Sequence, residues 1–126
     1  MTEVRRIKTT EVRPVREGLY LAQAGRCRLC QDHIVKGEDV LDHDHGTGAI
    51  RGVLHRSCNA LLGKVENNYR RHGVKNLAAW AHGVTPYLQH HAINRTGLLH
   101  PTHKTEDEKR LRRNKLARKR RAVKTQ

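Results

Sequence analysis

Apolar residues recur at two different spacings in the first half of the chain, and the change in spacing predicts a helix followed by a β-hairpin. Residues 14–24 repeat apolar side chains at helical spacing, and their proline lies in the first turn, where a helix tolerates it. Residues 40–45 and 50–55 flank Gly46-Thr47-Gly48, a turn sequence that favours a hairpin. We therefore expect a small α+β fold.

Two more helices are predicted after the hairpin. One runs from Cys58 to Glu66, with Ser57 as its N-cap. The other covers residues 76–89, where Pro86 lacks a backbone N–H, so that a kink or break is expected near Gly83. Its apolar face comprises Leu77, Trp80, Ala81, Val84 and Leu88, and its aromatic residues Trp80 and Tyr87 are expected to lie in the core.

Composition limits this fold to one domain with appendages. The chain has 126 residues and no phenylalanine, so it cannot build a large aromatic core. Proteins with such thin cores usually gain stability from a metal, disulfides or a partner subunit. The first residues show no secretory signal, and no window approaches the roughly 20 apolar residues of a membrane span. A cytoplasmic protein is therefore expected, in which the three cysteines favour metal binding over disulfides.

The formal net charge of +14 indicates a polyanionic partner, most often nucleic acid. Residues 104–126 contribute +8 of this charge, with eleven lysines and arginines against three acidic residues. Thr105 and Glu108 have capping-box spacing, which predicts that a helix begins there. Because the following residues are basic almost all round, this helix is expected to be solvated or partly disordered. A solubilising tail, a localisation signal or a docking site for an acidic protein would carry a similar charge. The residues predicted to contact DNA are Arg51, Lys109, Arg110, Arg112, Arg113, Lys115, Arg118, Lys119, Arg120 and Arg121.

Two pairs of metal-ligating residues flank the predicted hairpin. Cys27 and Cys30 form a Cys-x-x-Cys pair, and His55 and Cys58 form a His-x-x-Cys pair. Zinc prefers four such ligands in a tetrahedron, and a site made only of protein ligands is structural. The alternatives are ordinary buried thiols beside a surface histidine, or a redox-active cysteine pair. The redox alternative lacks the surrounding strand-helix-strand pattern.

A second polar cluster lies between these pairs. Along a strand, Asp42 and Asp44 point to one face and His43 and His45 to the other, unless a bulge or the strand end redirects them. In the structural alternative, the aspartates form salt bridges and the histidines are solvated. The arginines available for these bridges are Arg51 and Arg56.

The same cluster also has the residue types of a catalytic metal site. The carboxylate of Asp42 and the amide oxygen of Asn59 are hard donors of the kind that magnesium prefers. Histidine exchanges a proton near neutral pH, so His43 is a candidate general base for attacking water.

Taken together, these motifs resemble the phage recombination endonuclease VII family, a branch of the His-Asn-His nucleases with a ββα-metal fold. The resemblance covers about residues 19–68 well and continues more loosely beyond residue 76. The segments that carry it are Cys27 to Cys30, Leu41 to His45, Arg51 to Leu54 and Cys58 to Gly63.

The resemblance implies a role for each motif residue. It implies that Asp42 and Asn59 bind a catalytic magnesium or manganese ion and that His43 is the general base. It makes His45 a residue that orients the phosphate or the hairpin, and Asn67 a counterpart of the third residue of the His-Asn-His pattern. The structural zinc ligands would be Cys27, Cys30, His55 and Cys58.

Two positions depart from the family pattern. His55 stands where the family usually has a cysteine, and zinc accepts histidine equally well. Leu62 replaces an acidic residue that some members carry three positions after the metal-binding asparagine. A second carboxylate ligand is therefore not expected at that position.

Shifts in composition divide the chain into four parts, and the resemblance implies an activity. We expect a leader at 1–13, a zinc-bound nuclease core at 14–72, a helical segment at 73–103 that offers a dimer contact, and a DNA-binding tail at 104–126. The implied protein is a homodimeric endonuclease that cleaves branched DNA, such as four-way junctions, during phage recombination and packaging. It would leave 5′-phosphate ends and act in the host-cell cytoplasm. The alternatives are a general or sequence-selective nicking nuclease and a non-catalytic zinc-knuckle nucleic-acid-binding protein.

Overall fold

The structure, a computed structural model, describes residues 3–125 and has the expected small α+β fold. Residues 1–2 of the predicted leader and residue 126 of the predicted tail lie outside the described residues. Two units are distinguished, residues 1–80 and 81–126, and each is described by itself. The described elements are a 3-10 helix (Thr9–Glu11), α1 (Val12–Ala22), β1 (Asp39–His43), β2 (Ile50–His55), α2 (Arg56–Asn68), α3 (Leu77–His90) and α4 (Glu106–Lys124).

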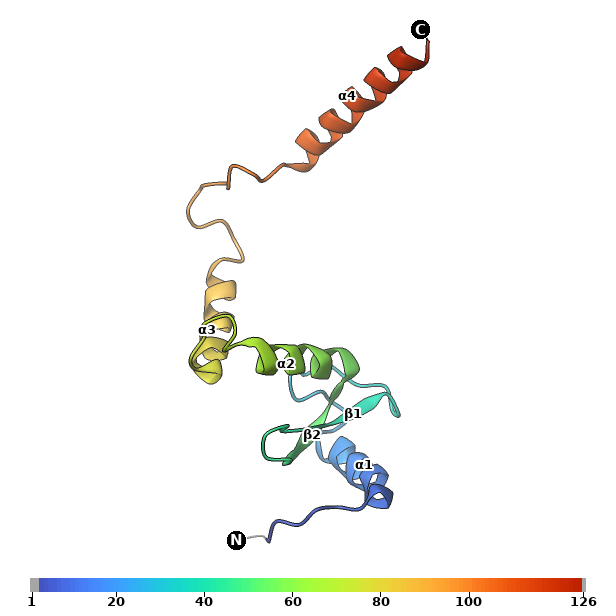
Figure 1. Cartoon of the computed structure of the whole chain (residues 1–126), viewed down its shortest axis with the longest axis vertical. Coiled ribbons are helices and arrows are strands. Elements are labelled where there is room, and N and C mark those ends of the chain that lie inside the picture. The colour runs from blue at the N-terminus through green and yellow to red at the C-terminus, as the bar shows by residue number, and fades with distance from the viewer. Residues whose placement is uncertain (1–2, 126) are drawn as a thin grey trace. The chain divides into compact units, whose positions relative to one another are not determined.

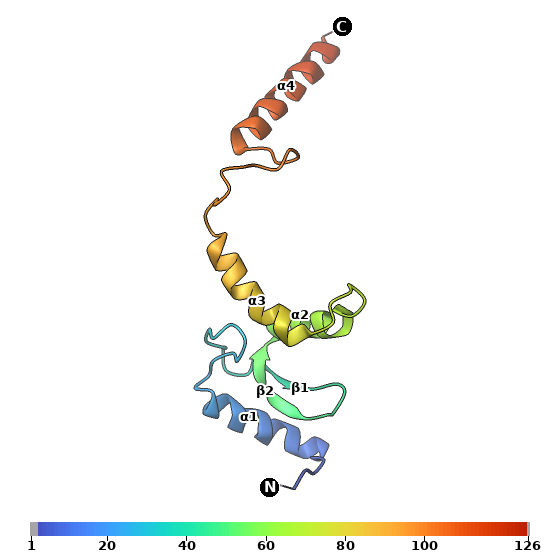
Figure 2. The ribbon, with the colours of Figure 1, turned by 90° about the vertical axis from the view of Figure 1, so that its left-hand side faces the viewer.

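The first unit is built around the predicted hairpin. Strands β1 and β2 pair antiparallel, and both α1 and α2 pack against them, with the hairpin between the two helices (Figures 1 and 2). Asp42 lies opposite Gly52, whereas His43 lies opposite Ile50, so Arg51 is the extra residue of a β-bulge. A bulge bends its strand and can redirect side chains beside a functional site.

The hydrophobic core is as small as the composition predicts. Its buried apolar side chains are Cys27, Ile34, Val53 and Leu54, and the half-buried Leu62 of α2 is among the residues that pack against it. Among the described residues, one of the four buried apolar side chains is thus itself a predicted zinc ligand, which couples the core to the metal site.

Gln23, directly after α1, acts as a polar tie between that helix and the hairpin. Its side chain is almost fully buried, and its amide donates to the Val53 carbonyl at 2.9 Å while its carbonyl accepts from the Val53 N–H at 2.9 Å. It donates as well to the Arg26 carbonyl at 2.8 Å. A side chain at residue 52 would collide with this amide, because a Cβ there would lie 2.7 Å from the Gln23 oxygen. Glycine at position 52 thus leaves room for the tie.

Replacing Gln23 with alanine should lower the free energy of unfolding by about 2–4 kcal/mol, since buried backbone groups of Val53 lose their partners. Urea denaturation of the zinc-loaded protein measures this change. The exposed Gln89→Ala is the matched control and should change stability by less than about 0.5 kcal/mol. Equal stability of both variants would contradict the assignment.

Several predicted helix limits are wrong by a few residues. Helix α1 covers 12–22 where 14–24 was expected, and the left-handed backbone of Gly25 (φ +69°) follows its end. Helix α2 begins at Arg56 directly after the strand, so His55 is its N-cap and the predicted cap, Ser57, lies inside the first turn. The chain passes from strand to helix without the intervening turn that a serine cap requires.

A second difference between the prediction and the structure concerns α3. Of the kink or break expected near Gly83, the break is wrong, because the helix continues through Gly83 and Pro86 to His90. The kink stays a prediction. Proline removes one backbone hydrogen bond there, and the carbonyl it frees lies on an exposed segment where water can replace the bond. The expectation that Trp80 and Tyr87 are core residues is also wrong, since their exposed fractions are 49% and 66%.

The second unit contains the basic helix α4. The predicted capping box is confirmed, because the Thr105 hydroxyl accepts from the Glu108 N–H at 3.2 Å and the Glu108 carboxylate accepts from the Thr105 N–H at 3.3 Å. Every described residue of α4 is exposed, as expected for a solvated helix. No helix within residues 3–125 combines the length and apolar character needed to cross a membrane.

Candidate metal and nuclease site

The four predicted zinc ligands converge where the loop that carries Cys27 and Cys30 meets β2 and α2. The sulfur atoms of Cys27, Cys30 and Cys58 and a ring nitrogen of His55 all lie within 4.8 Å of one another. Tetrahedral zinc with bonds of about 2.0–2.3 Å places its ligand atoms about 3.5–3.8 Å apart, so a small contraction completes the shell. The cluster can therefore hold a structural zinc ion.

A backbone carbonyl orients the histidine of this cluster. The Nε2 atom of His55 lies 3.0 Å from the carbonyl oxygen of His33, which can only accept, so Nε2 carries the proton. The opposite nitrogen, Nδ1, faces the thiols, at 3.2 Å from Cys30 Sγ and 4.0 Å from Cys58 Sγ. Zinc-binding histidines are commonly held in this way by a second hydrogen bond.

The pKa values of two thiols in the cluster also bear on cation binding. Burial acts to raise the pKa of Cys27, but hydrogen bonds from the backbone N–H groups of Cys30, His55 and Leu29 outweigh it and lower that pKa. Burial and the neighbouring Cys27 and Cys30 raise the pKa of Cys58. Cys27 therefore ionises more readily than an ordinary thiol and Cys58 less readily, and a divalent cation bound between them would favour the thiolate form of both.

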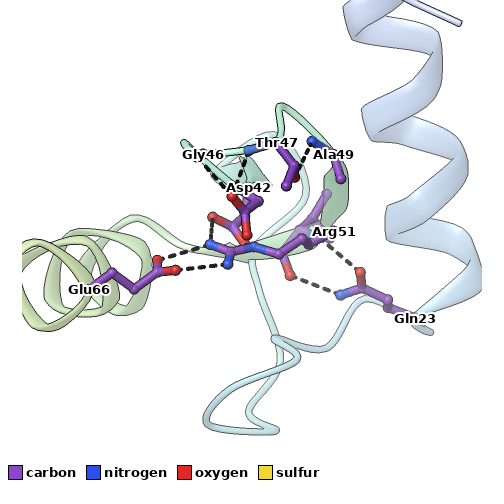
Figure 3. Close-up of polar contacts among 9 residues, drawn as sticks. Gln23, Asp42, Gly46, Thr47, Ala49, Arg51 and Glu66 are labelled. Carbon is purple, nitrogen blue, oxygen red and sulfur yellow. Dashed lines mark hydrogen bonds and ion pairs between the residues drawn. The ribbon is translucent and has the colours of Figure 1, made fainter. Parts of the chain in front are cut away.

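On β1, Asp42 is engaged in an ion-pair network (Figure 3). Its side chain is 9% exposed, and its two oxygens accept from Arg51 Nε at 2.7 Å and Arg51 Nη2 at 3.0 Å. The same guanidinium donates to the two oxygens of Glu66 on α2, at 2.9 and 3.0 Å. Glu66 and Asp42 together raise the pKa of Arg51. Asp42 thus forms the salt bridge with an arginine that the sequence offered as an alternative to a metal site.

Asp44 behaves differently from Asp42. One of its carboxylate oxygens accepts from the backbone N–H groups of Gly46 and Thr47, at 2.7 and 2.9 Å, and so shapes the hairpin turn. Both bonds lower the pKa of Asp44, and the bond from Thr47 has the larger effect. The salt bridge considered for Asp44 is replaced by backbone hydrogen bonds.

The histidines of this cluster lie on the solvent side. The rings of His43 and His45 stack with centroids 4.6 Å apart, and both residues are exposed. Strand β1 ends at His43, directly after the buried Asp42. A carboxylate shielded from water and an imidazole open to solvent therefore come from consecutive residues.

Helix α2 presents further predicted residues. Asn59 lies half-buried in its first turns, and Glu66 lies seven residues later on the same face of the helix. Leu62, between them, packs against the core, which explains why an apolar residue fits at this position. Oxygen donors therefore lie on both sides of Leu62 along this face.

An open groove of about 570 Å³ runs between the hairpin turn and the end of α2. It brings the predicted residues His45 and Asn67 together with Glu66, Tyr69 and Arg70, for which the sequence predicted no role in the site. The sequence shows only that these residues are neighbours in and just after α2. That they line one groove follows from the fold.

Two comparisons with known proteins bear on this site. The family model of recombination endonuclease VII matches residues 3–88, which is more than half of the chain. The Gene 59 protein of Mycobacterium phage D29 is 42% identical over 45 residues, which cover 35% of this chain and 27% of that protein. The Gene 59 protein of Mycobacterium phage L5 is 45% identical over 42 residues, covering 32% and 26%. The aligned part thus spans about a quarter of the length of these curated relatives.

Proposed function

Because this chain belongs to the recombination endonuclease VII family, we propose that it is a metal-dependent DNA endonuclease that cleaves branched DNA, including four-way (Holliday) junctions. The observation that carries the proposal is the end of β1, where the shielded carboxylate of Asp42 precedes the exposed imidazole of His43. The family and the similarity to proteins of two phages support a role in phage recombination. We extend the proposal to packaging and to the host-cell cytoplasm.

The donor chemistry of this region fits a hard divalent cation. Asp42 offers a carboxylate that already pairs with a positive charge, and Asn59 offers an amide oxygen. These two residues would hold a magnesium or manganese ion. Such an ion supplies positive charge that polarises the phosphate and stabilises the leaving 3′ oxygen.

His43 then moves the proton of the reaction. Its imidazole accepts a proton from the attacking water as the water oxygen bonds to phosphorus, while the bond between phosphorus and the 3′ oxygen breaks. The leaving 3′ oxygen takes a proton from solvent, so the products are a 5′-phosphate and a 3′-hydroxyl. His45, stacked on His43, limits its ring orientation and faces the groove that contains Asn67. We assign these two residues to orienting the phosphate.

The remaining parts of the chain bind and hold the substrate. The zinc cluster maintains the hairpin, and the basic residues of α4 contact phosphates without reading sequence. A homodimer would present two active sites to paired strands, and the half-exposed Trp80 of α3 is available for such a contact.

The deciding experiment compares cleavage of a labelled four-way junction with that of a linear duplex of matched sequence, in magnesium, using zinc-loaded protein. Junction-selective cutting by the wild type supports the proposal. Equal cutting of both substrates favours a general or sequence-selective nicking nuclease. Binding without any cutting by metal-replete protein favours a non-catalytic zinc-knuckle binding module.

Deleting the chain after Thr105 should weaken DNA binding and flatten its dependence on salt. The deletion removes ten lysines and arginines, and each phosphate contact on duplex DNA contributes about 0.9 to the slope of log K against log salt. Contacts from half of these residues would therefore reduce the slope by about 4–5. Fluorescence anisotropy at several salt concentrations measures it.

A charge-preserving control is provided by Leu111→Ala with Leu116→Ala, which keeps every basic residue of α4 and alters only exposed aliphatic side chains. This control should retain the wild-type slope. An unchanged slope in the deletion variant would mean that the tail does not contact phosphate.

A further inference from the structure

Arg51 occupies an unusual position between two acidic side chains. Its guanidinium makes two hydrogen bonds to Asp42 and two to Glu66, all between 2.7 and 3.0 Å (Figure 3). The three side chains carry a net charge of −1, and Arg51 is 32% exposed while Asp42 is 9% exposed. The guanidinium is therefore the resident counter-cation of a nearly buried carboxylate.

The β-bulge explains how Arg51 reaches this position. Gly52 lies opposite Asp42, so a regular strand would direct residue 51 to the other face of the hairpin. The bulge inserts Arg51 as an extra residue and brings its side chain onto the face of Asp42. Glu66 meets it from α2, and one guanidinium thus joins hairpin and helix.

This arrangement conflicts with simple binding of a divalent ion at Asp42. Both oxygens of Asp42 already accept from Arg51, and two cations at one carboxylate repel each other in a poorly hydrated site. Arg51 can leave Asp42 without losing all of its partners, because Glu66 holds it by two further bonds. Exchange of cations therefore does not leave the guanidinium unpaired.

We propose that Arg51 and the divalent ion compete for Asp42, and that Glu66 is the positioning residue that retains Arg51 when the ion binds. This inference rests on the proposed assignment of Asp42 to the catalytic ion. Arg51 was predicted from sequence to contact DNA, and the competition gives it a role before DNA arrives. Glu66 acts through Arg51 in this scheme and is not itself an ion ligand.

The test measures manganese binding by electron paramagnetic resonance, using full-length, zinc-loaded protein without chelator. Arg51→Gln should bind manganese about tenfold more tightly than wild type, because the competitor is absent. Glu66→Gln should bind several-fold more weakly, because Arg51 then has only Asp42 as partner. Asp42→Asn should lose manganese binding, and binding that persists in this variant would overturn the proposal.

The double variant separates positioning from ligation. If Glu66 acts only through Arg51, adding Glu66→Gln to Arg51→Gln should change manganese affinity by less than about twofold. A loss as large as in the wild-type background would mean that Glu66 binds the ion directly and would overturn its assigned role. Unchanged or weaker affinity in Arg51→Gln would overturn the competition itself.

Two further variants control for charge and folding. Arg28→Gln removes an exposed positive charge that lines the same shallow pocket as Asp42 and Arg51, and it should leave manganese affinity within about twofold. Arg51→Lys keeps a charge but lacks the fork that bonds both carboxylates, so its affinity should lie between wild type and Arg51→Gln. Equal effects of Arg28→Gln and Arg51→Gln would reduce the result to net charge and overturn the proposal.

Thermal melting gives a second readout that is independent of cleavage. Without manganese, Arg51→Gln leaves Asp42 shielded and unpaired and should melt below wild type, and manganese should raise its melting temperature more than that of wild type. Junction cleavage is measured in parallel. Asp42-dependent manganese binding with no cleavage would refute the nuclease proposal alone, whereas cleavage with equal manganese affinity in all Arg51 variants would refute the competition alone.

Discussion

Removing zinc should unfold the segment from residue 14 to residue 72 under conditions in which the zinc-loaded protein is folded. Its buried apolar side chains, within the described residues, are Cys27, Ile34, Val53 and Leu54, too few to offset the entropy of ordering this segment. Structural zinc contributes about 10–16 kcal/mol of apparent binding free energy in small domains. A small domain has a total stability of only about 5–15 kcal/mol, so the apo chain should lose its fold.

Calorimetry and circular dichroism before and after treatment with a strong chelator measure this loss, and a colorimetric indicator should detect one zinc ion released per chain. Cys58→Ser should reproduce the chelated state. His33→Ala is the matched control, because it removes an exposed imidazole but keeps the backbone carbonyl that orients His55. A cooperative melt that survives complete removal of zinc would disprove a structural role for the ion.

The zinc cluster was predictable because its signals are local. Each ligand pair is separated by two residues, and a spacing of this kind limits where the two side chains can point. The turn at residues 46–48 then predicts the hairpin that brings the pairs together, as the structure confirms. Short-range spacing thus determined both halves of the site and their connection.

The polar tie and the ion-pair network were not predictable in the same way. Gln23 and Val53 are thirty residues apart, and nothing in the glutamine's neighbourhood indicates that its amide pairs with a strand. The role of Arg51 depends on a β-bulge, which shifts the alternation of side chains and leaves no clear mark in the sequence. Glu66 was expected to end a helix, and its contact with Arg51 follows only from how α2 crosses the hairpin.

Replacing His43 with alanine should reduce the single-turnover rate of DNA cleavage by at least about 100-fold, which is the usual contribution of a general base. Because His43 is exposed, its removal leaves the core intact and should change stability by less than about 0.5 kcal/mol. DNA affinity and manganese affinity should stay near the wild-type values. Rates measured on a labelled junction at saturating protein isolate the chemical step from binding.

Two comparisons distinguish proton transfer from positioning at this residue. His82→Ala, at an exposed position on α3, should cleave at the wild-type rate. His45→Ala should lose less activity than His43→Ala, because it removes a residue that orients the phosphate and leaves the base in place. Free imidazole should partly restore cleavage by His43→Ala, since a diffusing base can accept the proton that the missing side chain no longer takes. Cleavage at the wild-type rate by His43→Ala would exclude this residue as the base. A slow variant that imidazole does not rescue would instead assign His43 to holding the phosphate.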